Sequence, residues 1–214
     1  MSEPAEAPRP LVLVVDDDPL MRDALQALFR SVGLRSEAFG STAALLARPL
    51  PDVESCLVLD VRLPGVSGLD FQAQLSRSDR ALPVIFMTGH GDIPMSVRAM
   101  MAGAVDFLAK PFRDQDMLDA VTTALERDRL HRRELEEVLR LQALYRGLTP
   151  RERQVMGHVA AGLMNKQIAG EIGLSEITVK IHRGNLMRKL GARTVADLVR
   201  IAETLRTHPI REAV

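Results

Sequence analysis

Five polar side chains in the amino-terminal half could together carry out one reaction. Each follows or ends a short apolar run, and they are Asp16, Asp17, Asp60, Thr88 and Lys110. Converging carboxylates repel one another unless a cation binds, and oxygen ligands without His or Cys favour a hard ion such as Mg²⁺. A hydroxyl and an ammonium can hold the oxygens of a transferring phosphoryl group, and a carboxylate can accept that group covalently. Taken alone, however, Asp60 would be only a strand-end carboxylate that caps the next turn.

The elements that must position these residues alternate along the chain. Apolar, strand-like runs occur at residues 11–15, 34–39, 56–60, 83–87 and 105–109, and amphipathic segments lie between them. This alternation predicts a parallel sheet with helices on both faces. All four strand ends that carry the polar groups then meet at the carboxyl edge of the sheet, where α/β proteins bind ligands. Asp18, directly before Pro19, is expected to cap the first helix.

The carboxyl-terminal third predicts short helices. Thr149 and Glu152 form a capping box around Pro150, and Asn165, Ser175 and Thr194 are the expected caps of the three helices that follow. A short helix, a turn with glycine and a longer basic helix form a helix-turn-helix pattern, in which the second helix enters the major groove. A generic four-helix bundle is the alternative.

Composition and charge fit two domains with different partners. Residues 1–128 contain 12 Lys and Arg against 19 Asp and Glu, whereas residues 147–214 contain 11 against 6. A basic excess of this size is weak evidence for a polyanion partner. The single cysteine, Cys56, excludes an internal disulfide and suits a reducing compartment. Because no apolar run approaches the length of a membrane span and residues 1–10 do not resemble a signal peptide, we expect a cytoplasmic protein without a membrane partner.

Residues 10–128 resemble the receiver domain of two-component response regulators. The match rests on Val14-Val-Asp-Asp17, Leu57-Val-Leu-Asp60 with Pro64-Gly65 and Gly68, Val84-Ile-Phe-Met-Thr88, and Asp106-Phe-Leu-Ala-Lys110-Pro111. The segment from Thr88 to Met100, with its His90-Gly-Asp-Ile-Pro stretch, is similar to the FixJ-like branch of the family.

This resemblance implies a role for each residue at the sheet edge. Asp60 is implied as the phosphoacceptor, and Mg²⁺ or Mn²⁺ is implied at Asp16, Asp17, Asp60 and the backbone carbonyl of Arg62. Thr88 and Lys110 are implied to bind the phosphoryl oxygens, and Lys110-Pro111 is expected to be a cis peptide. The resemblance makes Phe107 a switch residue that moves inward with Thr88; the alternative is a plain side chain of the last strand. His90 is expected to be an exposed loop side chain.

One position departs from the receiver pattern. Similar proteins usually carry Lys where this chain has Met101. An added methionine either widens an apolar patch used for dimer contact after phosphorylation or folds back against its own helix.

Residues 148–206 resemble the DNA-binding domain of the LuxR/NarL/FixJ type. The match rests on Leu148-Thr-Pro-Arg-Glu152, Gly162-Leu-Met-Asn-Lys-Gln-Ile-Ala169 and Thr178-Val-Lys-Ile-His182 through Leu190. It implies that Lys180, Ile181 and Gly184 face base edges. It also implies phosphate contacts from Asn165, Lys166, Thr178, His182, Arg183, Arg188 and Lys189. Glu152 is expected to act structurally, through the cap and a buried pair, and Gly184 stands where the family often has a longer side chain.

Together these features predict a five-stranded, parallel, doubly wound, flavodoxin-like α/β receiver and an all-α four-helix helix-turn-helix domain. The expected division is a disordered tail at 1–9, the receiver at 10–128, a helical linker at 129–147 and the DNA-binding domain at 148–208. The linker has apolar residues at heptad spacing for only about two heptads, so we expect a solvated helical spacer with one apolar face rather than a coiled coil.

The expected function is that of a transcription regulator which catalyses only its own phosphorylation and dephosphorylation. A sensor histidine kinase phosphorylates Asp60, the protein forms a homodimer and binds double-stranded DNA, and RNA polymerase is a further expected partner. A regulator that needs no phosphorylation is disfavoured by the complete acidic set with Thr88 and Lys110. A nucleotide-binding enzyme is disfavoured because Asp16-Asp-Asp-Pro19 is not a glycine-rich phosphate loop. A phosphate shuttle without output is disfavoured by the helix-turn-helix.

Overall fold

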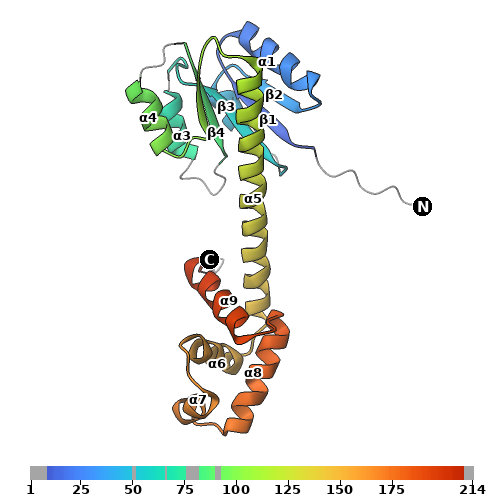
Figure 1. Ribbon diagram of the computed structural model, residues 1–214, viewed down its shortest axis with the longest axis vertical. Helices are drawn as coiled ribbons and strands as arrows, with labels where there is room; N and C mark the ends of the chain where they lie inside the picture. The colour runs from blue at the N-terminus through green and yellow to red at the C-terminus, as the bar shows by residue number, and fades with distance from the viewer. Residues whose placement is uncertain (1–8, 50–51, 66, 76–81, 90–92, 210–214) are drawn as a thin grey trace, which may run out of the picture. The chain divides into compact units, whose positions relative to one another are not determined.

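The computed structural model describes residues 9–49, 52–65, 67–75, 82–89 and 93–209 (Figure 1). Residues 1–8 of the expected tail and His90 lie outside the described residues. The chain divides into two compact units, Met1–Arg132 and Arg133–Val214. No helix in the described ranges combines the length and the apolar character that a membrane span requires.

The first unit is built on a five-stranded parallel sheet. The strands are β1 (Leu11–Val15), β2 (Arg35–Phe39), β3 (Ser55–Asp60), β4 (Val84–Thr88) and β5 (Asp106–Ala109). Their order in the sheet is β2-β1-β3-β4-β5, and every neighbouring pair is parallel. This is the doubly wound, flavodoxin-like order, so the predicted fold of the amino-terminal half is confirmed.

Helices cover both faces of this sheet. Successive side chains along each strand point to opposite faces, so each strand contributes to two cores. Leu11 and Leu13 of β1 point into one core, which lies on the side of α2 (Thr42–Leu46), α3 (Gly68–Leu75) and α4 (Ile93–Met101). Val12 and Val14 point into the other core, with α1 (Pro19–Ser31) and the first part of α5 (Asp114–Arg146). Burial on both faces explains why the central strands consist of continuous apolar runs.

Local signals in the sequence explain the helix ends of this unit. The Asp18 carboxylate accepts a hydrogen bond from the Leu20 N–H at 2.9 Å, and Pro19 opens α1, as predicted. The weaker strand β2 begins one residue later than expected, at Arg35, and its side chains are only partly buried. An edge strand has one face less protected than a central strand, which accounts for its weaker pattern.

A buried carboxylate ties α5 to the beginning of β3. Asp128 is 3% exposed, and its Oδ2 accepts hydrogen bonds from the Ser55 N–H at 2.9 Å and from Nε of Arg132 at 2.8 Å. Arg132 also reaches Asp52 at 3.1 Å. The first unit therefore holds α5 through a residue 73 positions away from its partner in sequence.

The second unit is the predicted all-α domain. It contains α6 (Pro150–Ala160), α7 (Asn165–Ile172), α8 (Glu176–Leu190) and α9 (Val195–Thr207) around a core that includes Val155, Ile168, Val179, Leu186 and Leu198. Thr149, Ser175 and Thr194 cap α6, α8 and α9 as expected.

The expected cap of α7 was wrong by one residue. Met164 is the N-cap, its N–H donates to Oε1 of Gln167 at 2.8 Å, and Asn165 is the first helical residue. The Asn165 side chain is used elsewhere, because its Oδ1 accepts a hydrogen bond from Arg183.

The long helix α5 runs unbroken from Asp114 to Arg146, since this stretch contains neither Pro nor Gly. Its last turns are not a plain solvated spacer. Val138 and Leu141 are buried, and the Gln142 amide donates to the His208 carbonyl at 3.1 Å. Leu135 and Leu139 remain exposed, so only one side of this part of the helix has the expected solvated character.

Candidate functional sites

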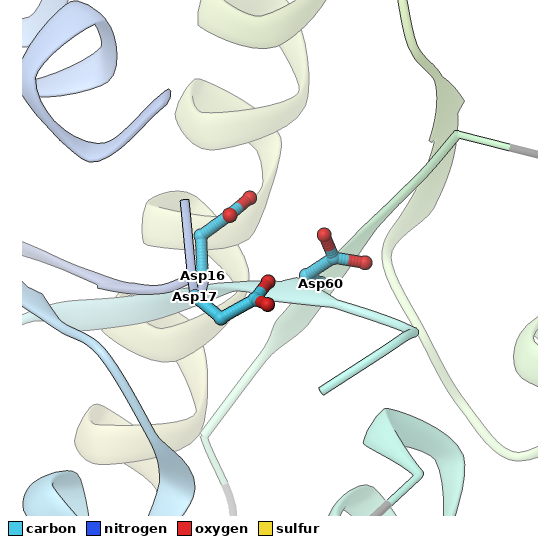
Figure 2. A group of neighbouring side chains, drawn as sticks. All are labelled: Asp16, Asp17 and Asp60. Atoms are coloured by element: carbon cyan, nitrogen blue, oxygen red, sulfur yellow. The ribbon is translucent and has the colours of Figure 1, made fainter. Parts of the chain in front are cut away.

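Three carboxylates meet at the carboxyl edge of the sheet, as the strand order requires. Asp16 and Asp17 follow β1, Asp60 ends β3, and β1 and β3 are neighbours (Figure 2). One oxygen from each of the three carboxylates lies within 4.8 Å of those of the other two. Asp16 and Asp60 are buried, whereas Asp17 is exposed.

Lys110 joins two of these carboxylates. Its ammonium lies 2.7 Å from Oδ2 of Asp16 and 2.7 Å from Oδ2 of Asp60. It follows β5 directly, and the Lys110-Pro111 peptide is cis, as predicted. Burial lowers the pKa of Lys110, but the hydrogen bonds and charges of Asp16 and Asp60 outweigh this effect and raise the pKa above its ordinary value. The lysine is therefore a fixed positive charge at the edge of the sheet.

Two of the three carboxylates accept hydrogen bonds from nearby backbone N–H groups. Oδ1 of Asp16 accepts from the Asp18 N–H, and Oδ1 of Asp60 accepts from the Arg62 N–H, both at 2.9 Å. Within the described part of the chain, the Asp17 carboxylate accepts no hydrogen bond. An exposed carboxylate beside two buried ones, all contributing oxygen, suits a hard divalent cation.

The buried position of Asp16 has an electrostatic cost. Burial raises the pKa of Asp16, and the hydrogen bonds from Lys110 and from the Asp18 N–H only partly oppose that rise. A cation near these oxygens would stabilise the ionised form of this carboxylate, because opposite charges favour the charged state.

Thr88 lies on β4, the strand next to that of Asp60, and Phe107 lies on β5, one strand farther away. Thr88 is buried at the end of β4, which pairs with β3 on one side and β5 on the other. The Phe107 ring of β5 is partly buried, with its centroid 6.3 Å from that of Phe86. The structure thus brings Thr88, Asp60 and Lys110 to one edge and leaves Phe107 between core and surface.

Gly68 allows the chain to pass close behind Asp60. A Cβ atom at position 68 would lie 2.6 Å from the carbonyl oxygen of Asp60. The Gly68 N–H also donates to the Val61 carbonyl at 3.0 Å. The backbone around Asp60 therefore has no room for a side chain at this position.

Sequence reasoning missed Arg22. Its Nη1 lies 2.7 Å from the carbonyl oxygen of Asp16 and 2.9 Å from that of Asp17. An arginine on the first turns of a helix is ordinary, and no residue pattern marks its contact with two backbone carbonyls.

The second candidate site is the exposed face of α8. With 3.6 residues per turn, Lys180, Gly184 and Arg188 lie along one side of the helix, and Ile181 lies beside them. Ile181 is 57% exposed, and Lys180, Gly184 and Arg188 are exposed as well. Ile177 shares this side and is 74% exposed, although we did not predict it. Its position three residues before Lys180 is the signal that could have identified it.

Three other residues predicted to contact DNA form hydrogen bonds with neighbouring side chains of α7, α8 or the turn between them. Nη1 of Arg183 donates to Oδ1 of Asn165 at 2.8 Å, and the hydroxyls of Thr178 and Ser175 lie 2.8 Å apart. Lys166 is exposed on α7, and His182 is partly buried on α8.

Lys189 differs from the rest of the predicted set. It lies nine residues after Lys180, about two and a half turns later, and so on the opposite side of α8. Its ammonium is 2.7 Å from Oε2 of Glu152, which is 3% exposed. The same Oε2 accepts the Thr149 N–H at 2.8 Å, so Glu152 has both the cap and the buried pair that we expected.

Two family models match the chain, one in each half. Residues 12–122 match the response regulator receiver domain, and residues 146–202 match the bacterial regulatory proteins of the luxR family.

Similar proteins extend over most of this chain. Nodulation protein W of Bradyrhizobium diazoefficiens is 60% identical over 91% of this chain and 86% of its own length. Response regulator protein TmoT of Ectopseudomonas mendocina is 45% identical over 92% of this chain and 89% of its own length.

Two solved structures are similar to this chain over most of its length. The response regulator StyR is 47% identical with a TM-score of 0.78, over 92% of this chain and 99% of that chain. Full-length FixJ from B. japonicum is 38% identical with a TM-score of 0.53, over 92% of this chain and 97% of that chain.

Proposed function

Because the chain belongs to the two-component response regulators that join a receiver domain to a LuxR-type DNA-binding domain, we propose that phosphorylation of Asp60 controls its binding to DNA. It is a transcriptional regulator rather than a classical enzyme. The observation that carries the proposal is the pairing of buried Asp60 with the Lys110 ammonium beside Asp16 and Asp17. The receiver spans residues 10–128, the helical linker 129–147 and the DNA-binding domain 148–208.

The proposed reaction transfers a phosphoryl group from a histidine of the partner kinase to Asp60. A carboxylate oxygen of Asp60 attacks phosphorus and forms a P–O bond, while the P–N bond to the imidazole breaks. The bonding electrons stay with the imidazole nitrogen, which takes up a proton. Hydrolysis of the resulting acyl phosphate returns Asp60 and inorganic phosphate, so the chain catalyses only its own modification and its reversal.

A divalent cation, Mg²⁺ or Mn²⁺, fits the oxygens of this site. Asp16, Asp17, Asp60 and the backbone carbonyl of Arg62 are the groups proposed to hold it, and when bound it neutralises charge on the phosphoryl oxygens. The all-oxygen donor set and the carboxylate of Asp17, which has no other partner in the described chain, support this assignment.

The remaining residues at this edge bind the phosphoryl group. Lys110, whose ammonium lies 2.7 Å from Asp60, pairs with the new negative charge. The Thr88 hydroxyl donates to a phosphoryl oxygen, and Phe107 then moves inward from its partly buried position. The adjacency of β3, β4 and β5 supports this sequence of contacts.

The output is a homodimer on double-stranded DNA. The proposed contact surface comprises α4, β5 and the first part of α5, where Val97, Met100 and Met101 are exposed.

On the DNA, Lys180, Ile181 and Gly184 face the bases, and the exposed side of α8 supports this orientation. The proposed phosphate contacts are Asn165, Lys166, Thr178, His182, Arg183 and Arg188, whereas Lys189 is the weakest of the expected contacts because Glu152 holds it. RNA polymerase is the further proposed partner, since relatives are named transcriptional regulatory proteins.

The test is labelling of the full chain with ³²P-acetyl phosphate in the presence of Mg²⁺. Asp60→Asn should abolish the label, because the amide cannot form the acyl phosphate. The matched control is Asp70→Asn, on the exposed side of α3, which should label like the wild type. Persistent labelling of Asp60→Asn would move the acceptor to another residue, and an unlabelled wild type would favour a regulator that works without phosphorylation.

A further inference from the structure

Arg22 contacts the main chain of the two residues that open the acidic site. Its Nη1 donates to the carbonyl oxygens of Asp16 and Asp17, at 2.7 and 2.9 Å. Successive carbonyls of an extended strand point in opposite directions, so two that converge on one nitrogen mark a turn. The guanidinium therefore holds the chain at the point where β1 ends.

The contact concerns the residue whose side chain has the most freedom. The Asp16 carboxylate is already fixed by Lys110 and by the Asp18 N–H. The Asp17 carboxylate is exposed and accepts no hydrogen bond within the described ranges, so only its backbone is restrained, and Arg22 supplies that restraint through the carbonyl.

The guanidinium itself has a defined place. It lies beside Gly40, just after β2, where an added Cβ would be 3.6 Å from Nη1 of Arg22. The Asp16 N–H donates to the Phe39 carbonyl at 3.2 Å, which joins the ends of β1 and β2 at the same corner. Arg22 is thus packed against the corner from which Asp16 and Asp17 project.

We infer that Arg22 is a positioning residue for the divalent cation: by holding the carbonyls of Asp16 and Asp17, it orients the Asp17 carboxylate toward Asp60. This inference rests on the proposed cation site. The effect of positioning is opposite in sign to that of charge. A nearby positive charge repels a cation, so an arginine that acted only through its charge would weaken cation binding. An arginine that positions the ligand strengthens it.

The opposite signs make the inference testable without any phosphorylation. The dissociation constant for Mn²⁺ is measured on the full, unphosphorylated chain by electron paramagnetic resonance, and Mg²⁺ competition gives the second constant. Groups that hold metal ligands in place typically change metal affinity by roughly 10- to 100-fold when removed, so Arg22→Gln should weaken Mn²⁺ binding by about 10-fold. Tighter or unchanged binding in Arg22→Gln would overturn the inference.

Two further variants separate the possible causes. Arg22→Lys keeps the charge but replaces the planar guanidinium by a shorter ammonium, and it should bind Mn²⁺ more weakly than the wild type. Wild-type affinity in Arg22→Lys would leave charge as the only role and overturn the positioning inference, even if Arg22→Gln failed to fold. Arg30→Gln removes an exposed arginine from the last turn of α1 and should leave the affinity unchanged.

A failure of the underlying cation site would look different. Asp17→Asn removes a proposed ligand and should abolish Mn²⁺ binding at this site. If the wild type bound no Mn²⁺, or if Asp17→Asn bound it normally, the cation proposal itself would fail. If both behaved as expected while Arg22→Gln and Arg22→Lys bound like the wild type, only the role of Arg22 would be wrong.

Discussion

The Lys110 ammonium lies 2.7 Å from Oδ2 of Asp60. This ion pair links the end of β3 to the residue that follows β5, across the carboxyl edge of the sheet. The same ammonium is 2.7 Å from Asp16, so one cation faces two buried carboxylates. Lys110 therefore pairs with two of the three carboxylates at this edge, and the burial of Asp16 has consequences for stability.

The first prediction concerns Asp16, whose charge should destabilise the fold when no cation is bound. Because burial raises its pKa above the ordinary 3.8, the folded state binds this proton more tightly than the unfolded state does. Protonated Asp16 therefore stabilises the folded state. This stabilisation is fully present below the pKa that Asp16 has in the unfolded chain, and it is lost as the pH rises through the pKa that Asp16 has in the folded protein. At neutral pH, Asp16→Asn should raise the Tm in EDTA by roughly 2–6 °C, the shift that about 1 kcal/mol produces in a domain of this size.

The measurement is thermal unfolding of both proteins in EDTA from acidic to neutral pH. The difference in Tm should grow as Asp16 ionises in the folded wild type. Asp70→Asn, an exposed carboxylate on α3, should change the Tm little at any pH. A Tm of Asp16→Asn below that of the wild type at neutral pH would contradict the prediction.

The second prediction concerns the Glu152–Lys189 pair in the DNA-binding unit. Burial tends to raise the pKa of Glu152, but the hydrogen bonds from Lys189 and Thr149 outweigh it and lower the pKa. Glu152→Ala should reduce the free energy of unfolding by about 2 kcal/mol, since hydrogen bonds to charged groups typically contribute roughly 1.5–3 kcal/mol. Urea denaturation of the full chain measures this loss.

The sign of the pH effect follows from the lowered pKa. The stability from Glu152 is present above its unfolded pKa, ordinarily 4.5, and is lost as the pH falls through the folded pKa. The gap between wild type and Glu152→Ala should therefore narrow in acid. Glu203→Ala, on the exposed side of α9, is the control and should leave both stability and its pH dependence nearly unchanged. A constant gap at all pH values would show that Glu152 contributes through packing alone.

The third prediction separates base contacts from phosphate contacts on DNA. Lys180→Ala should weaken specific binding more than non-specific binding, because lysine can donate to guanine O6 and N7 in the major groove. Lys166→Ala should weaken binding about equally for all sequences and reduce the slope of affinity against salt by about one. Fluorescence anisotropy with an operator and a scrambled duplex, over a range of salt concentrations, distinguishes them. An equal loss on both duplexes for Lys180→Ala would make Lys180 a phosphate contact.

The fourth prediction concerns Met101, which is 84% exposed at the end of α4. The side chain therefore does not fold back against its own helix, and with Val97 and Met100 it leaves apolar surface on α4. Met101→Lys should weaken the dimer of the phosphorylated protein, because it places a charge in the proposed contact surface. Sedimentation of the phosphorylated wild type and variants measures the dissociation constant of the dimer.

The control is Leu20→Lys, which adds the same charge at an exposed apolar position on α1. Equal weakening by both substitutions would point to net charge rather than to the α4 surface.

The sequence predicted the sheet and the acidic edge because both follow from local patterns. Continuous apolar runs such as Leu11–Val15 require burial on both faces, and a parallel sheet then brings Asp16, Asp17 and Asp60 together whatever the loops do. The same reasoning located α8, since Ser175 and Gly191 mark its two ends.

Contacts between a side chain and a distant backbone group could not be predicted. The hydrogen bond from the Ser55 N–H to Asp128 spans 73 residues, and the acceptor is one acidic residue among several on α5. The hydrogen bonds from Arg22 to the carbonyl oxygens of Asp16 and Asp17 likewise depend on the conformation of the turn after β1. Asn165 shows the converse error: its residue type suggested a cap, but Arg183 uses its oxygen instead.

The hydrogen bond between Asp128 and Ser55 also defines where this chain can be cut and rejoined. A chimera that keeps this receiver and exchanges the output domain needs α5 to remain native through Arg132, which bonds Asp128 on the same helix. A junction placed before Asp128 would leave a buried N–H at the start of β3 without its acceptor, and the damage would fall on the strand that ends in Asp60. A junction after Arg132 keeps the hydrogen bond that joins α5 to β3 and the bond from Arg132 to Asp128. The buried carboxylate of Asp128 therefore determines where the two domains can be joined.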